Sequence, residues 1–226
     1  MQKALLPLLA VLAAGCFDNI STDFPVDMTP LEENIAEFPA PKDGDPTPET
    51  LSIVDLPTRD FYLVHSRGYV KASLEDTYAA MRLPDNTVHK SEVDKWKVST
   101  AEDGAEECED LPAAIEFCHR LENTVNDLIT VEFNVVWRFA TSKRSKGGDR
   151  LEVIGRWQKT WGNEVLELLE GSILIRPHEG ASEDEPVTEI EIIEHLRAFA
   201  GEKEHSVDFV ESYYDAIVDG AHGGDN

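Results

Sequence analysis

The stretch TVEFNVVWRF, residues 130–139, decides the fold, because apolar and polar side chains alternate along it. In an extended chain, successive side chains point to opposite faces. The apolar positions therefore share one face: Val131, Phe133, Val135, Trp137 and Phe139. The polar residues between them share the other face. This pattern predicts a strand of an antiparallel sheet that is buried on one side only.

Short turns connect this strand to further alternating runs on its C-terminal side. A Gly-rich turn at 142–150 leads to LEVIGRWQKTW, residues 151–161, and a Gly-Asn pair leads to EVLELLEGSILIRP, residues 164–177. After an acidic connection, VTEIEIIEHLRAF, residues 187–199, continues the pattern. Because short turns between alternating runs are typical of hairpins, these segments predict an antiparallel meander.

Two helices and two further strands complete the predicted layout. DFYLVHSRGYVKAS, residues 60–73, has a strand pattern and ends at Ser73, which begins a capping box for a helix over 74–83. VDKWKVST, residues 93–100, alternates again. The C-terminal stretch repeats apolar residues at helical spacing up to Gly220: Val207, Val210, Tyr213, Tyr214, Ile217 and Val218.

The predicted fold class is α+β. We expect a curved antiparallel sheet of about six strands that grips a long C-terminal helix over 206–220, with a short helix after the first strand. A sheet with one apolar face needs a cover, and an amphipathic helix provides one. With 41% apolar residues, the chain can build a sizeable core.

The charge balance excludes one class of partner. The chain has 20 Lys and Arg against 45 Asp and Glu, a net charge of −25. Because nucleic-acid recognition starts from a basic face, nucleic acid is not expected as a partner.

The N-terminus is typical of an export signal. An apolar run over 4–14 follows Lys3 and ends at small residues before Cys16. The run is too short to span a bilayer and fits a signal peptide over 1–15. It resembles the lipobox of bacterial lipoproteins, although Ala13 stands where that family usually has a larger aliphatic residue.

The lipoprotein resemblance implies that Cys16 carries the lipid anchor, with three acyl chains that hold the protein on a membrane of the cell envelope. Phe17 follows the cysteine where the enteric inner-membrane retention signal has aspartate. By analogy, this favours the outer membrane. The competing interpretation is an ordinary secretory signal that happens to end near a cysteine.

The next segment, residues 16–58, predicts an extended tether. It has seven prolines after Asn19, many acidic residues and no sustained periodicity. A folded domain over 59–226 follows. As an alternative, the more apolar part at 49–60 packs on the domain as an irregular arm.

Two cysteines, Cys108 and Cys118, remain to pair after processing. A disulfide is one interpretation, since an oxidising compartment preserves such bonds. The other is a helix that begins in DLPAAIEFCHRLEN, residues 110–123, which would hold the two sulfurs too far apart. No metal site and no cofactor are predicted, because the chain has no CxxC motif and its seven histidines lack ligand spacing.

The folded part resembles the START-like, or SRPBCC, superfamily of helix-grip proteins. The resemblance is based on HSRGYVKASLEDTYAAM, residues 65–81, on the hairpins over 130–177 and on the last strand that leads into the helix. It covers residues 61–220. It implies a cavity between sheet and helix that holds lipids or other apolar ligands, and it implies no shared catalytic set.

On this resemblance, one set of residues would line the cavity: Phe133, Val135, Trp137, Trp157, Ile173, Ile192, Val210, Tyr214 and Ile217. Trp161 and Tyr213 are further candidates. The alternative is that these side chains are ordinary packing residues between the sheet and the helix.

Three other features are candidate sites, and each also has an interpretation without a function. His195 is either a polar contact or a general base in a pocket, or it is a structural or exposed histidine. The adjacent pair Cys118-His119 is a poor catalytic couple, because neighbouring strand residues point to opposite faces. The basic turn with Lys143, Arg144, Lys146 and Arg150 either rests on anionic headgroups or is a solvated hairpin turn.

The leading functional hypothesis is a membrane-anchored lipoprotein that binds an apolar small molecule or lipid and is not an enzyme. The alternative is a structural or adaptor lipoprotein with a filled core that binds a protein partner of unknown identity. An enzyme of the cyclase or hydrolase type is a third, weaker hypothesis.

Overall fold

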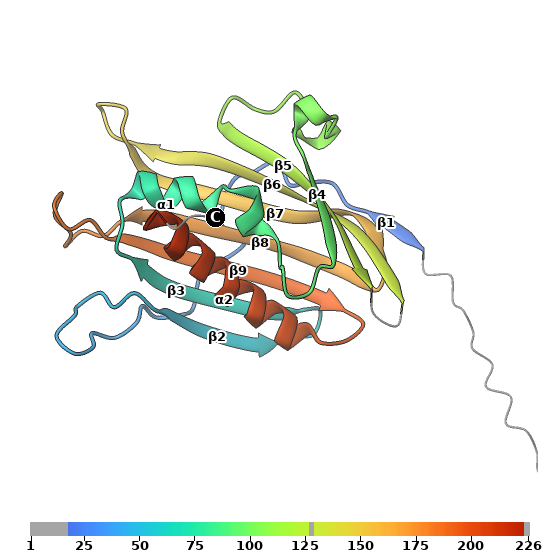
Figure 1. Ribbon diagram of the computed structural model, residues 1–226, viewed down its shortest axis with the longest axis horizontal. Coiled ribbons are helices and arrows are strands. Elements are labelled where there is room, and N and C mark those ends of the chain that lie inside the picture. The colour runs from blue at the N-terminus through green and yellow to red at the C-terminus, as the bar shows by residue number, and fades with distance from the viewer. Residues whose placement is uncertain (1–17, 127–128, 224–226) are drawn as a thin grey trace, which may run out of the picture.

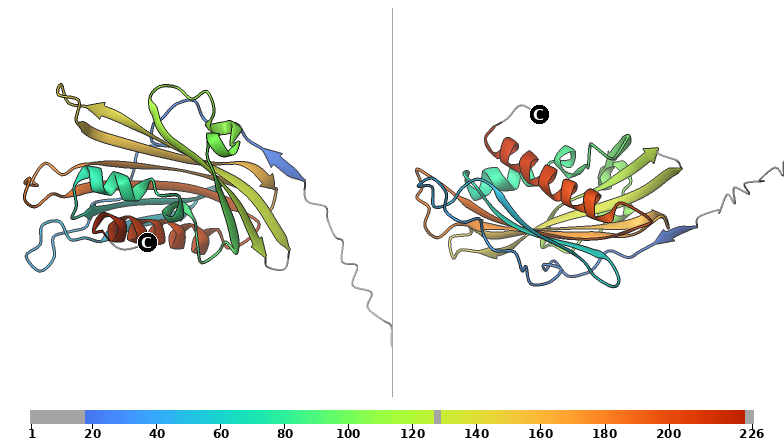
Figure 2. Two further views of the ribbon diagram at one scale, coloured as in Figure 1. Left: turned by 45° about the horizontal axis from the view of Figure 1, so that its top comes forward. Right: turned by 90° about the horizontal axis from the view of Figure 1, so that it is seen from below.

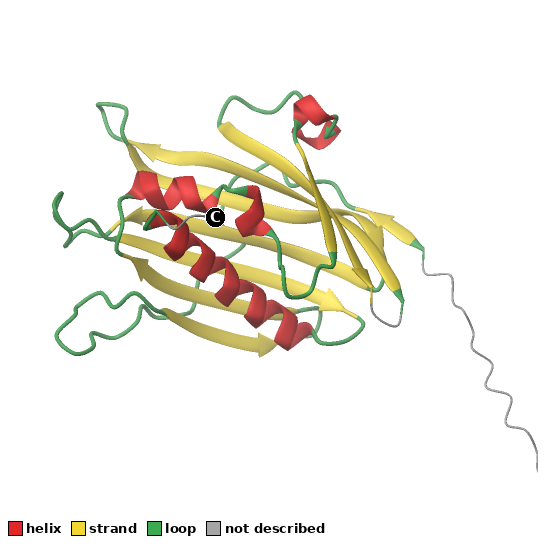
Figure 3. Cartoon of the chain, viewed as in Figure 1, coloured by secondary structure: helices red, strands yellow, loops and turns green. Residues whose placement is uncertain are grey.

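The structure is a computed structural model that describes residues 18–126 and 129–223. Figure 1 labels its helices and strands, and Figure 3 colours them by type. The elements, with 3-10 turns marked η, are β1 (Asn19–Ser21), β2 (Leu51–Pro57), β3 (Tyr62–Val70), α1 (Leu74–Met81), η1 (Pro84–Thr87), β4 (Lys95–Ser99), η2 (Ala101–Asp103), η3 (Glu106–Cys108), β5 (Ile115–Asn126), β6 (Thr130–Arg144), β7 (Arg150–Asn163), β8 (Leu166–Pro177), β9 (Thr188–Ala198) and α2 (Glu202–Ala221).

One antiparallel sheet of nine strands forms the body of the molecule. Its order is β2-β3-β9-β8-β7-β6-β5-β4, and β1 pairs with the end of β7. The prediction of about six strands is therefore wrong. The three strands that the sequence did not reveal are β1 and β2, which lie in the proline-rich segment, and β5, which lies in the segment considered as a helix.

The side chains of β5 explain why its sequence did not predict a strand. Its core-facing positions include His119, Leu121 and Asn123, all of which are buried. Two of these three side chains are polar, so the alternation does not stand out by hydropathy. The residues Asp110 and Pro112 just before it also resemble a helix start. Pairing with β4 and β6 along its length outweighs this local signal.

The two helices cover one face of the curved sheet, as both views in Figure 2 show. Ser73 caps α1 by accepting a hydrogen bond from the backbone N–H of Asp76, which confirms the predicted helix start. The helix α2 is also confirmed. It buries one side against the sheet through Phe209, Val210, Tyr213, Tyr214 and Ile217.

The segment between β1 and β2, residues 22–50, packs against the opposite face of the sheet, and we call it the arm (Figure 2). The side chain of Arg156 donates to the carbonyl of Thr29 at 2.7 Å, and the Leu31 N–H donates to Ser172 Oγ at 3.1 Å. Asn34 and Ala36 are buried. The prediction of a free tether over 16–58 is thus wrong from residue 19 onward.

The arm binds without a strand ladder, and this explains why its prolines are tolerated. Four of its backbone groups bond to side chains of the sheet: the carbonyls of Asp23 and Thr29 accept from Gln158 and Arg156, and the N–H groups of Leu31 and Ile35 donate to Ser172 and His65. These single bonds form no ladder, so a missing proline N–H costs no ladder hydrogen bond. Among the described residues, no helix is long and apolar enough to cross a membrane.

Candidate functional site

The structure brings the predicted cavity residues together, but their side chains pack directly against one another. All nine belong to one buried cluster between the sheet and the helices. The rings of Trp137 and Trp157 stack with centroids 4.6 Å apart. Phe209 and Tyr213 of α2 close over them, at 5.8 Å from Trp157 and 5.4 Å from Trp137. The side chains that would line a ligand cavity therefore fill the space beneath the helix.

Two glycines allow the aromatic rings to lie directly on the sheet. A Cβ at Gly171 would overlap the ring of Trp157, and one at Gly155 would come within 2.7 Å of Ile173. Tyr213 and Tyr214 satisfy their buried hydroxyls by donating to the carbonyls of Met81 and Tyr69. These contacts are those of a close-packed core.

One carboxyl group is enclosed in this core. Glu194 on β9 is buried, and burial raises its pKa to about 8, although a hydrogen bond from Ser206 opposes the shift. The Ser206 Oγ donates to Glu194 Oε1 at 2.6 Å. A carboxyl with this pKa is mostly neutral at pH 7, which is how the core accommodates it.

A hollow of about 290 Å³ lies beside the core at the β4 end of the sheet. Its walls include Trp96, Phe133 and Trp161 together with charged and amide side chains, among them Lys97 and Glu122. Of the predicted cavity residues, Phe133 and the further candidate Trp161 border it, and the rest do not.

The two cysteines form a disulfide with a Cα–Cα distance of 5.6 Å. Of the two arrangements considered, the structure has the bridge, and the alternative helix over 110–123 is a strand from Ile115 onward. Cys118 therefore has no free thiol. His119 points into the core, where burial lowers its pKa to about 3.

The basic turn is largely neutralised by neighbouring acids. Lys143 pairs with Glu152, and Arg144 pairs with Glu116. Arg150 pairs with Glu116 and also with Glu75. Three of the four cations considered for headgroup binding thus already have carboxylate partners, which removes most of the charge on which that interpretation depends.

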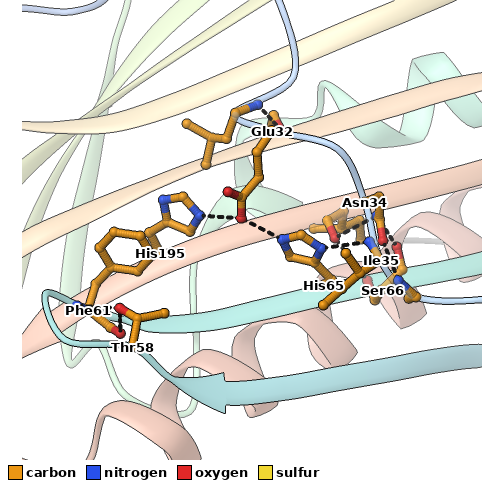
Figure 4. Close-up of polar contacts among 12 residues, drawn as sticks. Glu32, Asn34, Ile35, Thr58, Phe61, His65, Ser66 and His195 are labelled. Atoms are coloured by element: carbon orange, nitrogen blue, oxygen red, sulfur yellow. Dashed lines mark hydrogen bonds and ion pairs between the residues drawn. The ribbon is translucent and has the colours of Figure 1, made fainter.

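A cluster of titratable groups lies on the opposite face of the sheet, under the arm (Figure 4). His65 on β3 and His195 on β9 point to the same carboxylate, that of Glu32 in the arm. The distances to Glu32 Oε1 are 2.8 Å from His65 Nε2 and 3.2 Å from His195 Nε2. A second carboxylate, Glu170 on β8, lies 3.2 Å from His195 Nδ1. We call these four residues the histidine cluster.

The hydrogen bonds around His65 define its tautomer. The backbone N–H of Ile35 donates to His65 Nδ1 at 2.9 Å, so the ring carries its proton on Nε2 and donates it to Glu32. Burial lowers the pKa of His65, and Glu32 only partly offsets this. Burial alone would raise the pKa of Glu32, but hydrogen bonds from the two histidines hold it below its ordinary value.

His195 is less fully determined, because each ring nitrogen faces a carboxylate oxygen. A neutral ring has only one N–H to donate. Its second nitrogen then presents a lone pair to a carboxylate unless a proton or another cation lies there. The ring is held flat against Phe61, with centroids 4.1 Å apart.

Sequence spacing could not reveal this cluster. Glu32 is 33 residues from His65 and 163 residues from His195. The sequence singled out one member of the cluster, His195, which shares a strand face with Val187 and Ile193 and was a candidate pocket residue. Cys16 and the signal peptide over 1–15 lie outside the described residues.

Comparison with known proteins adds little about function. The chain matches no protein-family model and no curated protein. Among solved structures, it is similar to the crystal structure of TTHA0849 from Thermus thermophilus. The TM-score is 0.46 and the sequence identity 12%, over 73% of this chain and 99% of that chain. A likeness at this level carries no functional conclusion.

Proposed function

We propose that this protein is a lipid-anchored, non-catalytic lipoprotein of the bacterial cell envelope, with a helix-grip domain of the START-like kind. In this proposal the core is filled and the domain acts through its outer surface, as a structural or adaptor protein for a protein partner. The ligand-binding role that the superfamily resemblance implies becomes the second candidate.

The observation that carries this choice is the ring stack beneath α2. A pocket that holds an apolar ligand needs its lining side chains to stand apart, with a volume of about 300 Å³ or more. Trp137 and Trp157 instead stack on each other and are closed over by α2. Both rings are almost completely buried by protein atoms alone.

Two observations support the envelope location. The first is the N-terminal signal that ends at Cys16, where the lipid would be attached. The second is the disulfide between Cys108 and Cys118, since such bonds persist in oxidising compartments. Phe17 after the anchor cysteine favours the outer membrane in this proposal.

The hydrogen-bond partners of His65 and His195 support the non-catalytic part of the proposal. The hydrogen bonds of His65 and His195 within the described residues go to carboxylates and to a backbone N–H, not to a hydroxyl. Cys118 is oxidised. A nucleophile next to a base, the usual sign of hydrolytic chemistry, is not formed by these groups.

The test is native mass spectrometry of protein made without residues 1–16, purified from a bacterial host. We expect the mass of the bare chain. A co-purified lipid that survives purification at one copy per chain would contradict the filled-core proposal.

The second candidate is an amphipathic small molecule in the hollow at the β4 end. The observation that favours it is the grouping of Trp96, Phe133 and Trp161 beside polar side chains. If a ligand co-purifies, Trp96→Ala should lose it, whereas Trp157→Phe, which changes the core, should keep it.

A further inference from the structure

We infer that Glu32, His65 and His195 bind a divalent first-row transition metal such as Zn²⁺. The ligands would be Glu32 Oε1, His65 Nε2 and His195 Nε2, which all lie within 4.8 Å of one another. This inference goes beyond the proposed adaptor role and does not depend on it, because the cluster lies on the face opposite to the core.

The two histidines come from rigid, neighbouring strands. In the β3–β9 ladder, Leu63 is opposite His195 and His65 is opposite Ile193, so the histidines are diagonal neighbours on one face. Both side chains are almost completely buried. The sheet therefore holds the backbones of both histidines in place before any ion arrives, and this favours binding.

A metal resolves the unsatisfied geometry at His195. With the ion on Nε2, the neutral ring carries its proton on Nδ1 and donates it to Glu170, 3.2 Å away. A carboxylate that accepts from the outer nitrogen of a ligating histidine is a recurrent support of metal sites. Neither nitrogen of His195 then presents a lone pair to a carboxylate.

The donor set fits a borderline metal ion. Imidazole nitrogens with one carboxylate and no thiolate suit zinc and its neighbours. Tetrahedral ligands at about 2.0 Å from zinc are about 3.3 Å from one another. The distances of 2.8 and 3.2 Å to Glu32 Oε1 need to widen by about 0.1–0.5 Å, and the Nε2 atoms of the two histidines, which lie within 4.8 Å of each other, need to reach the same spacing.

Access and charge also favour an ion. The side chain of Glu32 is 43% exposed, so the site opens to solvent on the arm side. The net charge of −25 concentrates cations near the surface. Because Glu32 belongs to the arm and the histidines belong to the sheet, the ion would join the two.

Metal binding must also change the tautomer of His65. A neutral ring that coordinates through Nε2 carries its proton on Nδ1, which can then no longer accept from the Ile35 N–H. The hydrogen bond of 2.9 Å from Ile35 is therefore exchanged for the metal bond. This exchange gives a spectroscopic signature that a loosely associated surface ion would not produce.

The test is isothermal titration of ZnCl₂ into untagged protein made without residues 1–16, since every residue of the described fold lies after them. We expect one Zn²⁺ per chain. Glu32→Gln and His195→Ala should weaken binding more than Glu170→Gln, which should weaken it about 10- to 100-fold. His178→Ala is the control, because this half-buried histidine pairs with Glu189 elsewhere on the surface.

Glu32→Gln keeps the test informative if a buried-histidine variant fails to fold, since Glu32 is on the exposed side of the cluster. In ¹⁵N spectra of the histidine rings, we expect His65 Nδ1 to gain a proton when zinc is added. No heat of binding, equal affinity in Glu32→Gln and wild type, or a loss in His178→Ala would each overturn the inference.

Discussion

At the scale of single residues, Gly171 controls how closely the core can pack. The glycine lies on β8 opposite Trp157 in the β7–β8 ladder. Because it has no Cβ, the indole ring lies flat across the strand and stacks on Trp137. The core is thus filled for two reasons: Gly171 has no side chain, and the large rings of Trp137 and Trp157 occupy the space above it.

Gly171→Ala should therefore destabilise the protein, since the new Cβ would overlap the Trp157 ring and force it out of its stack. Overpacking of this kind costs roughly 1–3 kcal/mol in the free energy of unfolding. Urea denaturation followed by tryptophan fluorescence measures it. Gly147→Ala in the exposed β6–β7 turn is the matched control and should change stability little. An unchanged midpoint in Gly171→Ala would mean that the core has spare room.

The free-energy cost of burying His119 depends on pH. Thr87 donates its hydroxyl to the carbonyl of Pro84, so it can only accept from His119 Nε2 at 2.9 Å. The neutral ring therefore has its proton on Nε2 and leaves Nδ1 without a partner in the core. Adding a proton there buries a charge with nothing to neutralise it, which is why the pKa falls to about 3.

The sign of the pH dependence follows from this lowered pKa. Between about 3 and the ordinary histidine value of 6.5, the unfolded chain binds a proton at His119 that the folded chain does not. Stability is thus lost as the pH falls. From about pH 8 to about pH 5 the loss is on the order of 2 kcal/mol.

His119→Gln should remove this contribution, because glutamine keeps an N–H donor and does not titrate. We expect the difference in unfolding free energy between wild type and variant to shift in favour of the variant as the pH is lowered. The measurement is urea denaturation at several pH values. A constant difference would show that His119 is not the group that responds to acid.

At the scale of elements, hydropathy predicted best where one strand face is uniformly apolar. Trp137 and its alternating neighbours on β6 were placed correctly, and so were the capped start of α1 at Ser73 and the buried side of α2. β5 was missed because the polar side chains of His119 and Asn123 occupy buried positions. The hydrogen-bond partner of His119, Thr87, is distant in sequence, so no local pattern encodes it.

The arm was missed for a related reason. Asn34 is buried because its side-chain amide donates to the carbonyl of Ser66 at 3.0 Å and its oxygen accepts from the Ala36 N–H. The bond to Ser66 depends on the sheet that the arm meets, and a proline-rich acidic segment has no hydrophobic periodicity that would reveal it. The histidine cluster could not be predicted, since Glu32 lies in that same segment.

The disulfide joins η3, which lies in the connection between β4 and β5, to the strand β5. The bridged cysteines are separated by 10 residues. Closing a loop of this size contributes roughly 2–3 kcal/mol on the chain-entropy model. The double variant Cys108→Ala with Cys118→Ala should therefore unfold at a lower urea concentration than wild type. Its circular dichroism spectrum without urea should show that α2 and the sheet are still formed. If reduction and double substitution both leave the midpoint unchanged, the connection is held by packing alone.

At the scale of the whole molecule, the sheet is covered on both faces. The helices fill the concave side, and the arm lies along the other side and brings Glu32 to the two histidines (Figures 2 and 4). The strand β1 and the arm are thus part of the domain, and the proposed anchor at Cys16 lies three residues before β1.

Replacing the proposed anchor gives the most direct test of the envelope assignment. In cells that express the full chain, Cys16→Ser should move the protein from the membrane fraction to the soluble fraction and abolish incorporation of labelled palmitate. The Cys108→Ala, Cys118→Ala double variant is the control, because it removes the other cysteines and should keep the label. Continued labelling of Cys16→Ser would rule out this residue as the lipid attachment point.

The pairing of β1 with β7 also sets how far the domain can reach. A free chain over 16–58 could have spanned more than about 100 Å, but Asn19 is already fixed to the sheet, only three residues after Cys16. If Cys16 is lipidated, the three residues from the anchor to Asn19 can span at most about 10 Å. The corner of the sheet at β1 then stays against the headgroups, and the protein works within one domain diameter of its bilayer.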